Sequence, residues 1–168
     1  MRARQPLLIA LVGLALVASA FTPNRPRMVW NASASVPVGL YRIQAGPIRR
    51  GDLVLVRPPL EVAELTQRRG YLPKSAYLIK IVAATGGDRV CRFADRVFVR
   101  GLLVARAAGR DRIGRAMPSW WGCRRLQAGN LFLLAPDIDS FDSRYFGAVP
   151  QAQVVGRAAP LWLMPAGS

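Results

Sequence analysis

The chain has 168 residues, of which 52% are apolar and 20% charged, so we expect one folded domain rather than a disordered chain. It contains no histidine and only two cysteines, which excludes a Ser-His-Asp triad and a Cys-His pair and argues against a zinc site; we expect neither a metal nor a cofactor. The net charge of +15 would suit nucleic acid or anionic lipid, but the 22 arginines and two lysines lie singly or in pairs, so no nucleic-acid partner is expected.

The amino-terminal segment is apolar and follows two arginines. Its densest apolar part runs from Leu7 to Phe21, and as a helix it would rise about 22 Å, short of a bilayer core of about 30 Å. With its flanks the segment could just span a membrane, and the arginines ahead of it favour a cytoplasmic amino terminus. A secretory signal peptide cleaved after Ala20, in the sequence Ala-Ser-Ala, is the alternative, and a helix of a soluble core is a third reading.

Both export interpretations place the rest of the chain outside the cytoplasm. The sequence therefore divides into a signal or membrane-anchor segment, residues 1–27, and an exported domain, residues 28–168. A disulfide between Cys91 and Cys123 is plausible in an oxidising compartment, although spacing alone does not show that the two thiols can meet.

The exported domain reads as short strands separated by Gly, Pro and Asp, which predicts a mainly β fold. The first strand, 51–59, is stopped by two prolines, and one short helix is expected at 62–69. A hairpin at 96–105 turns at an Arg-Gly pair, and residues 106–125, rich in Gly, Arg and Pro, read as a long loop. Further strands are expected at 76–88, 130–136 and 152–164.

The most apolar of these strands carries a lysine. Residues 77–82 read Tyr-Leu-Ile-Lys-Ile-Val, and because both faces of this strand are apolar, Lys80 should be desolvated whichever way it points. Burial lowers the pKa of a lysine, and a neutral lysine can act as a general base, whereas an arginine cannot. The alternative is a lysine whose stem lies on apolar surface while its ammonium reaches water.

A lysine base needs a nucleophile, and two serines stand upstream. If residues 30–41 are extended, Ser33 and Ser35 share one face, and Pro37 and Gly39 then shape a turn. The alternative interpretation of this segment is an ordinary polar linker after the apolar amino terminus.

Four motifs in chain order resemble the type I signal peptidase family, and most closely its conjugative-transfer, TraF-like branch. They are NASASVPVGLY at 31–41, RGDLVLV at 50–56, KIVAATGGD at 80–88 and SFDSRYFGAVP at 140–150. The Gly-Asp pair stands seven and eight residues after Lys80, as in the lysine box of the family. The serine box has the form S-x-P-x-G of the TraF-like branch rather than the S-x-x-P of housekeeping signal peptidases.

The resemblance implies a signal-peptidase-like β fold and a Ser-Lys dyad, in which Ser35 is the nucleophile and Lys80 the general base. The Ser33 hydroxyl would be an oxyanion donor beside the Ser35 backbone N–H, and Ser33 is also the fallback nucleophile. Ser140 would hydrogen-bond and orient Lys80.

The remaining motif residues are implied to be structural. Asp142 and Arg144 would form a pair beneath the site, with a surface turn carrying a weak ion pair as the alternative. Gly87 and Asp88 would support the lysine strand as part of its box.

The resemblance further implies a membrane-associated serine endopeptidase that cleaves an exported precursor after small residues, such as a pilin-like substrate of conjugation. Its partners would be that precursor, the membrane and the conjugative transfer apparatus. The expected location is the bacterial inner membrane with the catalytic domain in the periplasm, or the soluble periplasm after cleavage at Ala20. Alternatives are a housekeeping-type signal peptidase that removes leader peptides, a self-cleaving Ser-Lys repressor, against which the export segment argues, and a non-catalytic anchored subunit of a transfer apparatus.

Overall fold

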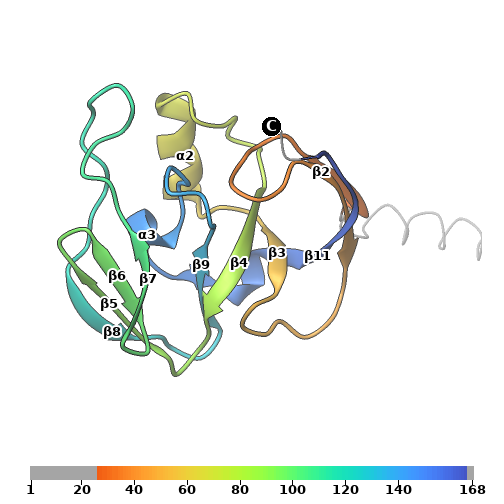
Figure 1. Cartoon of the computed structure of the whole chain (residues 1–168). Helices are drawn as coiled ribbons and strands as arrows, with labels where there is room; N and C mark the ends of the chain where they lie inside the picture. Colours follow the sequence, from red (N-terminus) through yellow and green to blue (C-terminus); the bar gives the residue numbers. More distant parts are fainter. Residues whose placement is uncertain (1–25, 166–168) are drawn as a thin grey trace, which may run out of the picture.

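The computed structural model of the protein describes residues 26–165 and confirms a mainly β fold (Figure 1). The predicted anchor or signal segment, apart from its last two residues, and the cleavage site at Ala20 lie outside the described residues. Within residues 26–165, no helix is both long enough and apolar enough to cross a membrane. The elements are β1 (Met28–Asn31), β2 (Gly39–Gln44), β3 (Leu53–Val56), α2 (Leu60–Arg68), β4 (Leu78–Ala84), β5 (Arg89–Phe93), β6 (Arg96–Val99), β7 (Leu102–Arg106), β8 (Gly122–Arg125), β9 (Asn130–Leu134), α3 (Ser143–Phe146), β10 (Val149–Pro150), a 3-10 turn η1 (Gln151–Gln153) and β11 (Val154–Leu163).

The larger sheet is antiparallel throughout and has the strand order β1-β2-β11-β3-β4-β9-β10. Its central strands are apolar on both faces because both faces are covered. Val82 of β4 packs in one buried cluster with Val54 and Leu133. Ile79 of the same strand packs in a second cluster with Tyr41. Strand β4 is therefore buried on both sides, as its composition predicted.

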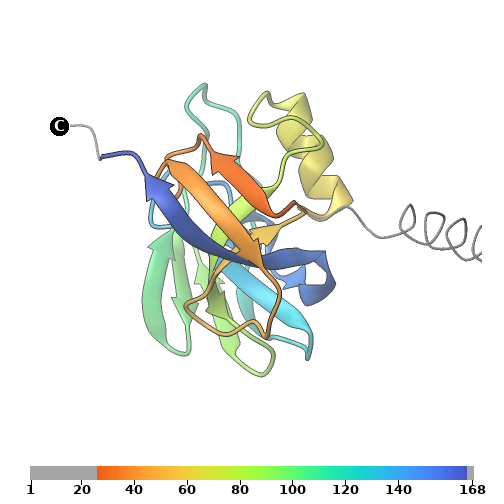
Figure 2. The same cartoon turned by 90° about the vertical axis from the view of Figure 1, so that its right-hand side faces the viewer.

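The smaller sheet is a second antiparallel layer with the order β7-β6-β5-β8. Its inward residues Val90 and Val97 pack on Phe132 of β9, so the two sheets share a third buried cluster. Figures 1 and 2 show the smaller sheet at one end of the molecule and strands β1, β2 and β11 at the other.

Most of the predicted elements are confirmed with shifted ends. The strands expected at 51–59, 76–88, 130–136 and 152–164 are β3, β4, β9 and β11, and the hairpin is β6–β7. The predicted helix is α2, which begins two residues early, directly after Pro59. The prediction of a continuous loop over 106–125 is wrong at its end, where Gly122–Arg125 form β8. That short, polar segment has no strand-like alternation, and it is a strand because it pairs with β5.

A disulfide joins two neighbouring strands of the smaller sheet. Cys91 of β5 and Cys123 of β8 are direct partners in the strand register, and their sulfurs are bonded. The bond closes a loop with a sequence separation of 32 residues, which includes the hairpin β6–β7 and the excursion that follows it.

We expect the double substitution Cys91→Ala/Cys123→Ala to lower the free energy of unfolding by about 3–4 kcal/mol. A disulfide that closes a loop of this length reduces the conformational entropy of the unfolded chain, and the variant lacks that restriction. Denaturant titration of the variant and of the wild type, with and without reductant, measures the loss. Reduced wild type should match the variant. The same unfolding midpoint for the oxidised wild type, the reduced wild type and the variant would contradict the expectation.

Candidate active site

Lys80 lies at the centre of β4 and is 3% exposed. The alternative of a lysine that reaches bulk water is therefore wrong. Its Nζ lies 2.6 Å from the Ser140 Oγ, and its cross-strand neighbour is Val54. Desolvation lowers the pKa of Lys80 from 10.5 to about 8; Asp142 and Asp137 partly oppose this, and the Arg144 guanidinium adds to it. A substantial part of the population thus carries a neutral amine near pH 8.

The segment that carries Ser140 is held in place by a buried ion pair. Asp142 caps the short helix α3, and its carboxylate accepts from Arg144 Nε (2.8 Å), Arg144 Nη2 (3.0 Å) and the Ala135 amide (2.9 Å). The two side chains are 0% and 2% exposed, so the alternative of a weak surface ion pair is wrong here. Burial raises the pKa of Asp142, which the Arg144 guanidinium opposes.

Arg144 also joins three segments through its remaining donors. Its guanidinium donates to the backbone oxygens of Ala135, Ile138 and Arg106. The residue therefore ties the end of β9 and the end of β7 to the loop that presents Ser140.

We expect Arg144→Met to destabilise the fold by about 3–5 kcal/mol, because it leaves the Asp142 carboxylate buried without its cation. The matched control is Arg112→Met, which removes the exposed ion pair with Asp139 (2.7 Å; 84% and 52% exposed) and should leave the free energy of unfolding nearly unchanged. Equilibrium urea unfolding compares the two variants. Equal losses of unfolding free energy in the two variants would contradict a larger contribution of the buried ion pair to stability.

Ser33 and Ser35 lie in a hydrogen-bonded turn between β1 and β2, not in an extended segment and not in a plain linker. Their Oγ atoms are 2.9 Å apart, with Ser33 exposed and Ser35 half-buried. Asn31, buried at the end of β1, holds the turn: its Nδ2 donates to the backbone oxygens of Ser33, Val36 and Pro37, and its Oδ1 accepts from the Ser33 amide and hydroxyl.

The structure explains why two further residues of the serine box, Gly39 and Tyr41, are a glycine and a tyrosine. Gly39 begins β2 where the strand packs against β11, and a Cβ there would collide with the Trp162 backbone oxygen. Tyr41 is 1% exposed and donates its hydroxyl to the Pro37 backbone oxygen at 2.6 Å. Together they fix the chain on the carboxyl side of the serine turn.

The structure thus brings the predicted residues together in two pairs, Lys80 with Ser140 and Ser33 with Ser35. Val36, next to Ser35, packs in the same cluster as Ile79, so the serine turn contacts β4 on the face that Ile79 presents. Within the described residues no hydrogen bond links Ser35 directly to Lys80. Hydrogen bonds of this kind are often long in an empty site and shorten when substrate binds.

Gly87 and Asp88 lie apart from these pairs, in the turn from β4 to β5. Gly87 has a φ of +91°, which favours glycine, and the Asp88 carboxylate accepts from the Thr85 amide at 3.0 Å. They shape the exit of the lysine strand and make no hydrogen bond to Lys80 or Ser140.

Three site-supporting residues were missed from the sequence. Asn31 gives a signal that could have been used, since an Asn two residues before a serine at a strand end favours an Asx turn. The roles of Ser143, whose Oγ accepts from the Leu133 amide, and of Arg92, which donates to the Arg144 backbone oxygen, depend on contacts between distant segments. Within residues 26–165, no group of acidic or cysteine side chains is arranged to hold a metal ion.

Comparison with known proteins assigns these motifs to a family. The family model described as signal peptidase, peptidase S26, matches residues 2–163. The conjugal transfer protein TraF of Agrobacterium tumefaciens (strain 15955) is 36% identical, and the match covers 96% of this chain and 98% of that protein. The plasmid transfer protein TraF of Escherichia coli is 33% identical over 135 residues, covering 74% and 76% of the two chains. Among solved structures, a signal peptidase I from Enterococcus faecalis V583 matches with a TM-score of 0.41 and 17% identity, over 68% of this chain and 98% of that one.

Proposed function

Because the chain belongs to the signal peptidase family, peptidase S26, we propose that it is a serine endopeptidase in which Ser35 is the nucleophile and Lys80 the general base. The observation that carries the proposal is the state of Lys80. It is a buried amine with a pKa lowered to about 8 and is hydrogen-bonded to Ser140, and the turn with the two serine hydroxyls packs on the same strand through Val36 and Ile79. The described residues include no histidine, so a lysine is the available base.

In the acylation step, neutral Lys80 accepts the proton of the Ser35 hydroxyl while Oγ attacks the carbonyl carbon of the scissile peptide bond. The negative charge that develops on the carbonyl oxygen is stabilised by the Ser35 backbone N–H and the Ser33 hydroxyl. Protonated Lys80 then donates its proton to the leaving amine as the C–N bond breaks. The product is an ester between Ser35 and the amino-terminal fragment.

In the deacylation step, Lys80 is neutral again and accepts a proton from an attacking water molecule. The ester bond breaks, the proton returns to Ser35 Oγ, and the carboxylic acid product leaves. Ser140 keeps the amine oriented in both steps, because its hydroxyl can accept from the ammonium and donate to the neutral amine.

The proposed setting is the membrane surface, with the domain in the periplasm. An apolar edge supports it, made of residues that are 39–61% exposed on β1 and at the end of β11: Met28, Trp30, Leu161, Trp162, Leu163 and Met164. Trp30 and Trp162 stack at 5.7 Å, and indole rings are favoured at the boundary between lipid and water. Leu163 pairs with Gly39, so this edge adjoins the serine turn.

The proposed substrate is an exported precursor of a conjugative transfer system, such as a pilin-like protein cleaved after a small residue. Support comes from the relatives named as transfer proteins, which match 96% and 74% of the chain, and from the S-x-P-x-G form of the serine box.

The test is to incubate the full chain, purified in detergent, with such a precursor and to read the new amino terminus by mass spectrometry. A general secretory precursor with a cleavable leader is the comparison substrate. Cleavage of the transfer precursor alone supports the proposal, and cleavage of the secretory precursor alone would instead indicate a housekeeping-type signal peptidase. A protein that cleaves neither, although folded, would be the non-catalytic subunit.

A further inference from the structure

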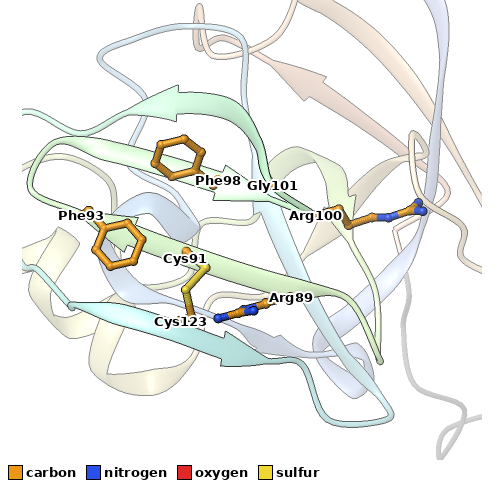
Figure 3. Close-up of a pocket in the computed structure, with 7 residues that line it drawn as sticks. All are labelled: Arg89, Cys91, Phe93, Phe98, Arg100, Gly101 and Cys123. Atoms are coloured by element: carbon orange, nitrogen blue, oxygen red, sulfur yellow. A yellow bond between two sulfur atoms is a disulfide. The ribbon is translucent and has the colours of Figure 1, made fainter.

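The outer face of the smaller sheet is a feature that the proposed peptidase site does not use. Along β5 and β6 the residues alternate: Val90 and Val97 point into the core, whereas Cys91, Phe93 and Phe98 lie on the opposite face. Figure 3 shows the Cys91–Cys123 disulfide between β5 and β8, with the rings of Phe93 and Phe98 and the Arg89 side chain around it. These side chains line an open hollow of about 560 Å³.

The charge on this face is unbalanced. Arg89 and Arg125 are exposed direct partners in the register of β5 and β8, two residue pairs away from the disulfide. Like charges directly opposite one another destabilise a sheet. Within residues 26–165, neither guanidinium makes an ion pair, and the hydrogen bond from Arg125 Nε goes to the Gly87 backbone oxygen at 3.1 Å. An anionic group placed between them would relieve the repulsion.

Aromatic rings extend the face beside these arginines. Phe93 is 39% exposed and meets Trp121 edge to face at 5.3 Å, and Trp121 itself is 68% exposed. Phe98 lies 6.4 Å from Phe93 on the other side. Exposed aromatic residues and arginine are the side chains most enriched where proteins bind other proteins.

We propose that this face, defined by Arg89, Arg125, Phe93, Phe98 and Trp121, docks an acidic polypeptide segment of a partner protein. Carboxylates of the segment pair with Arg89 and Arg125, and an apolar side chain enters the hollow beside the disulfide. The disulfide fixes the floor of the hollow, so the surface is formed before the partner arrives. The inference does not depend on Ser35 or Lys80, which lie in the serine turn and in β4.

Three other occupants fit the surface less well. A second copy of this chain also carries a net charge of +15, so its approach is opposed by like charge. A membrane reached through the amino-terminal segment would lie near β1, which follows that segment and belongs with β2 to the opposite end of the molecule (Figures 1 and 2). Nucleic acid favours a track of cations along its phosphates, whereas Arg89 and Arg125 are one cross-strand pair.

The test uses the full chain in detergent and a fluorescein-labelled peptide rich in glutamate with one central leucine. We expect fluorescence anisotropy to show binding that weakens with salt and that disappears when glutamine replaces the glutamates. Arg89→Gln/Arg125→Gln should weaken it by about tenfold or more. Arg49→Gln/Arg50→Gln, which removes the same charge from the exposed turn between β2 and β3, should leave it unchanged. Both variants should keep the wild-type rate of precursor cleavage, or its absence.

Equal weakening by both double variants would overturn the proposal, because the peptide would then follow the net charge of the molecule. It would also be overturned if the glutamate peptide fails to bind, or if vesicles of phosphatidylglycerol or a single-stranded oligonucleotide bind through Arg89 and Arg125 while the peptide does not. Phe93→Ser is the second variant: it should weaken the leucine peptide more than one with glycine in place of the leucine. Equal effects on both peptides would contradict a role for the hollow.

Discussion

Ser35→Ala should abolish precursor cleavage while the protein still folds and accumulates. The substitution removes one oxygen atom from a half-buried side chain, so the turn keeps its frame of hydrogen bonds from Asn31. Without the Oγ there is no atom to form the acyl ester, and the loss should reach the limit of detection, as expected when the nucleophile of a covalent mechanism is removed. The readout is the amino terminus of the precursor after incubation with the purified variant.

The neighbouring serine is the control for this assignment. Ser33→Ala removes an oxyanion donor and should lower kcat by about 10²–10³-fold, leaving measurable cleavage. If Ser35→Ala stays active and Ser33→Ala is inactive, the nucleophile is Ser33 instead. The hydroxyls are 2.9 Å apart, so the two variants must be compared side by side.

Lys80→Arg should lower cleavage by about 10²–10⁴-fold, because arginine keeps the positive charge but does not accept a proton at ordinary pH. Lys80→Met, which also has an unbranched side chain, should be equally inactive, so the loss does not depend on the size of a guanidinium in a buried site. Thermal unfolding of both variants shows whether the fold is kept.

Lys74→Arg is the matched control, since Lys74 is the other lysine of the chain and makes an exposed ion pair with Glu64 at 3.3 Å. It should remain fully active. The wild-type rate should rise with pH through about 8, because Lys80 is protonated and inactive as a base below its pKa and neutral above it. An active Lys80→Arg protein would remove lysine from the mechanism.

Much of the candidate site could be predicted because its chemistry is visible in short motifs. A lysine in the most apolar strand of an arginine-rich chain indicates burial by composition alone, and Lys80 is 3% exposed. The family resemblance of the motif at 140–150 implies that Ser140 orients Lys80, and the two side chains lie 2.6 Å apart although 60 residues separate them in the chain. The strands with runs of β-branched residues were also predictable from composition, because a strand that is buried on both faces has a continuous apolar sequence.

The remaining features depend on contacts that no local pattern encodes. Strand β8 is polar and half-exposed, and it forms by pairing with β5. Arg92 looks like one more surface arginine in the sequence, yet it is 4% exposed because its guanidinium donates to the Arg144 backbone oxygen, 52 residues away. The sequence allows an extended segment at the two serines, whereas the three hydrogen bonds from Asn31 bend the chain into a turn.

The central claim is that Lys80 is a buried amine able to act as a base near neutral pH, and the chain offers a direct way to measure it. In Lys74→Arg, Lys80 is the sole lysine, so lysine labelled with carbon-13 at Cε gives one side-chain signal in the NMR spectrum of the full chain. Titration of that signal should show a midpoint at about 8. A midpoint near the ordinary lysine value of about 10.4 would show that the amine is charged at neutral pH and would contradict the proposed mechanism.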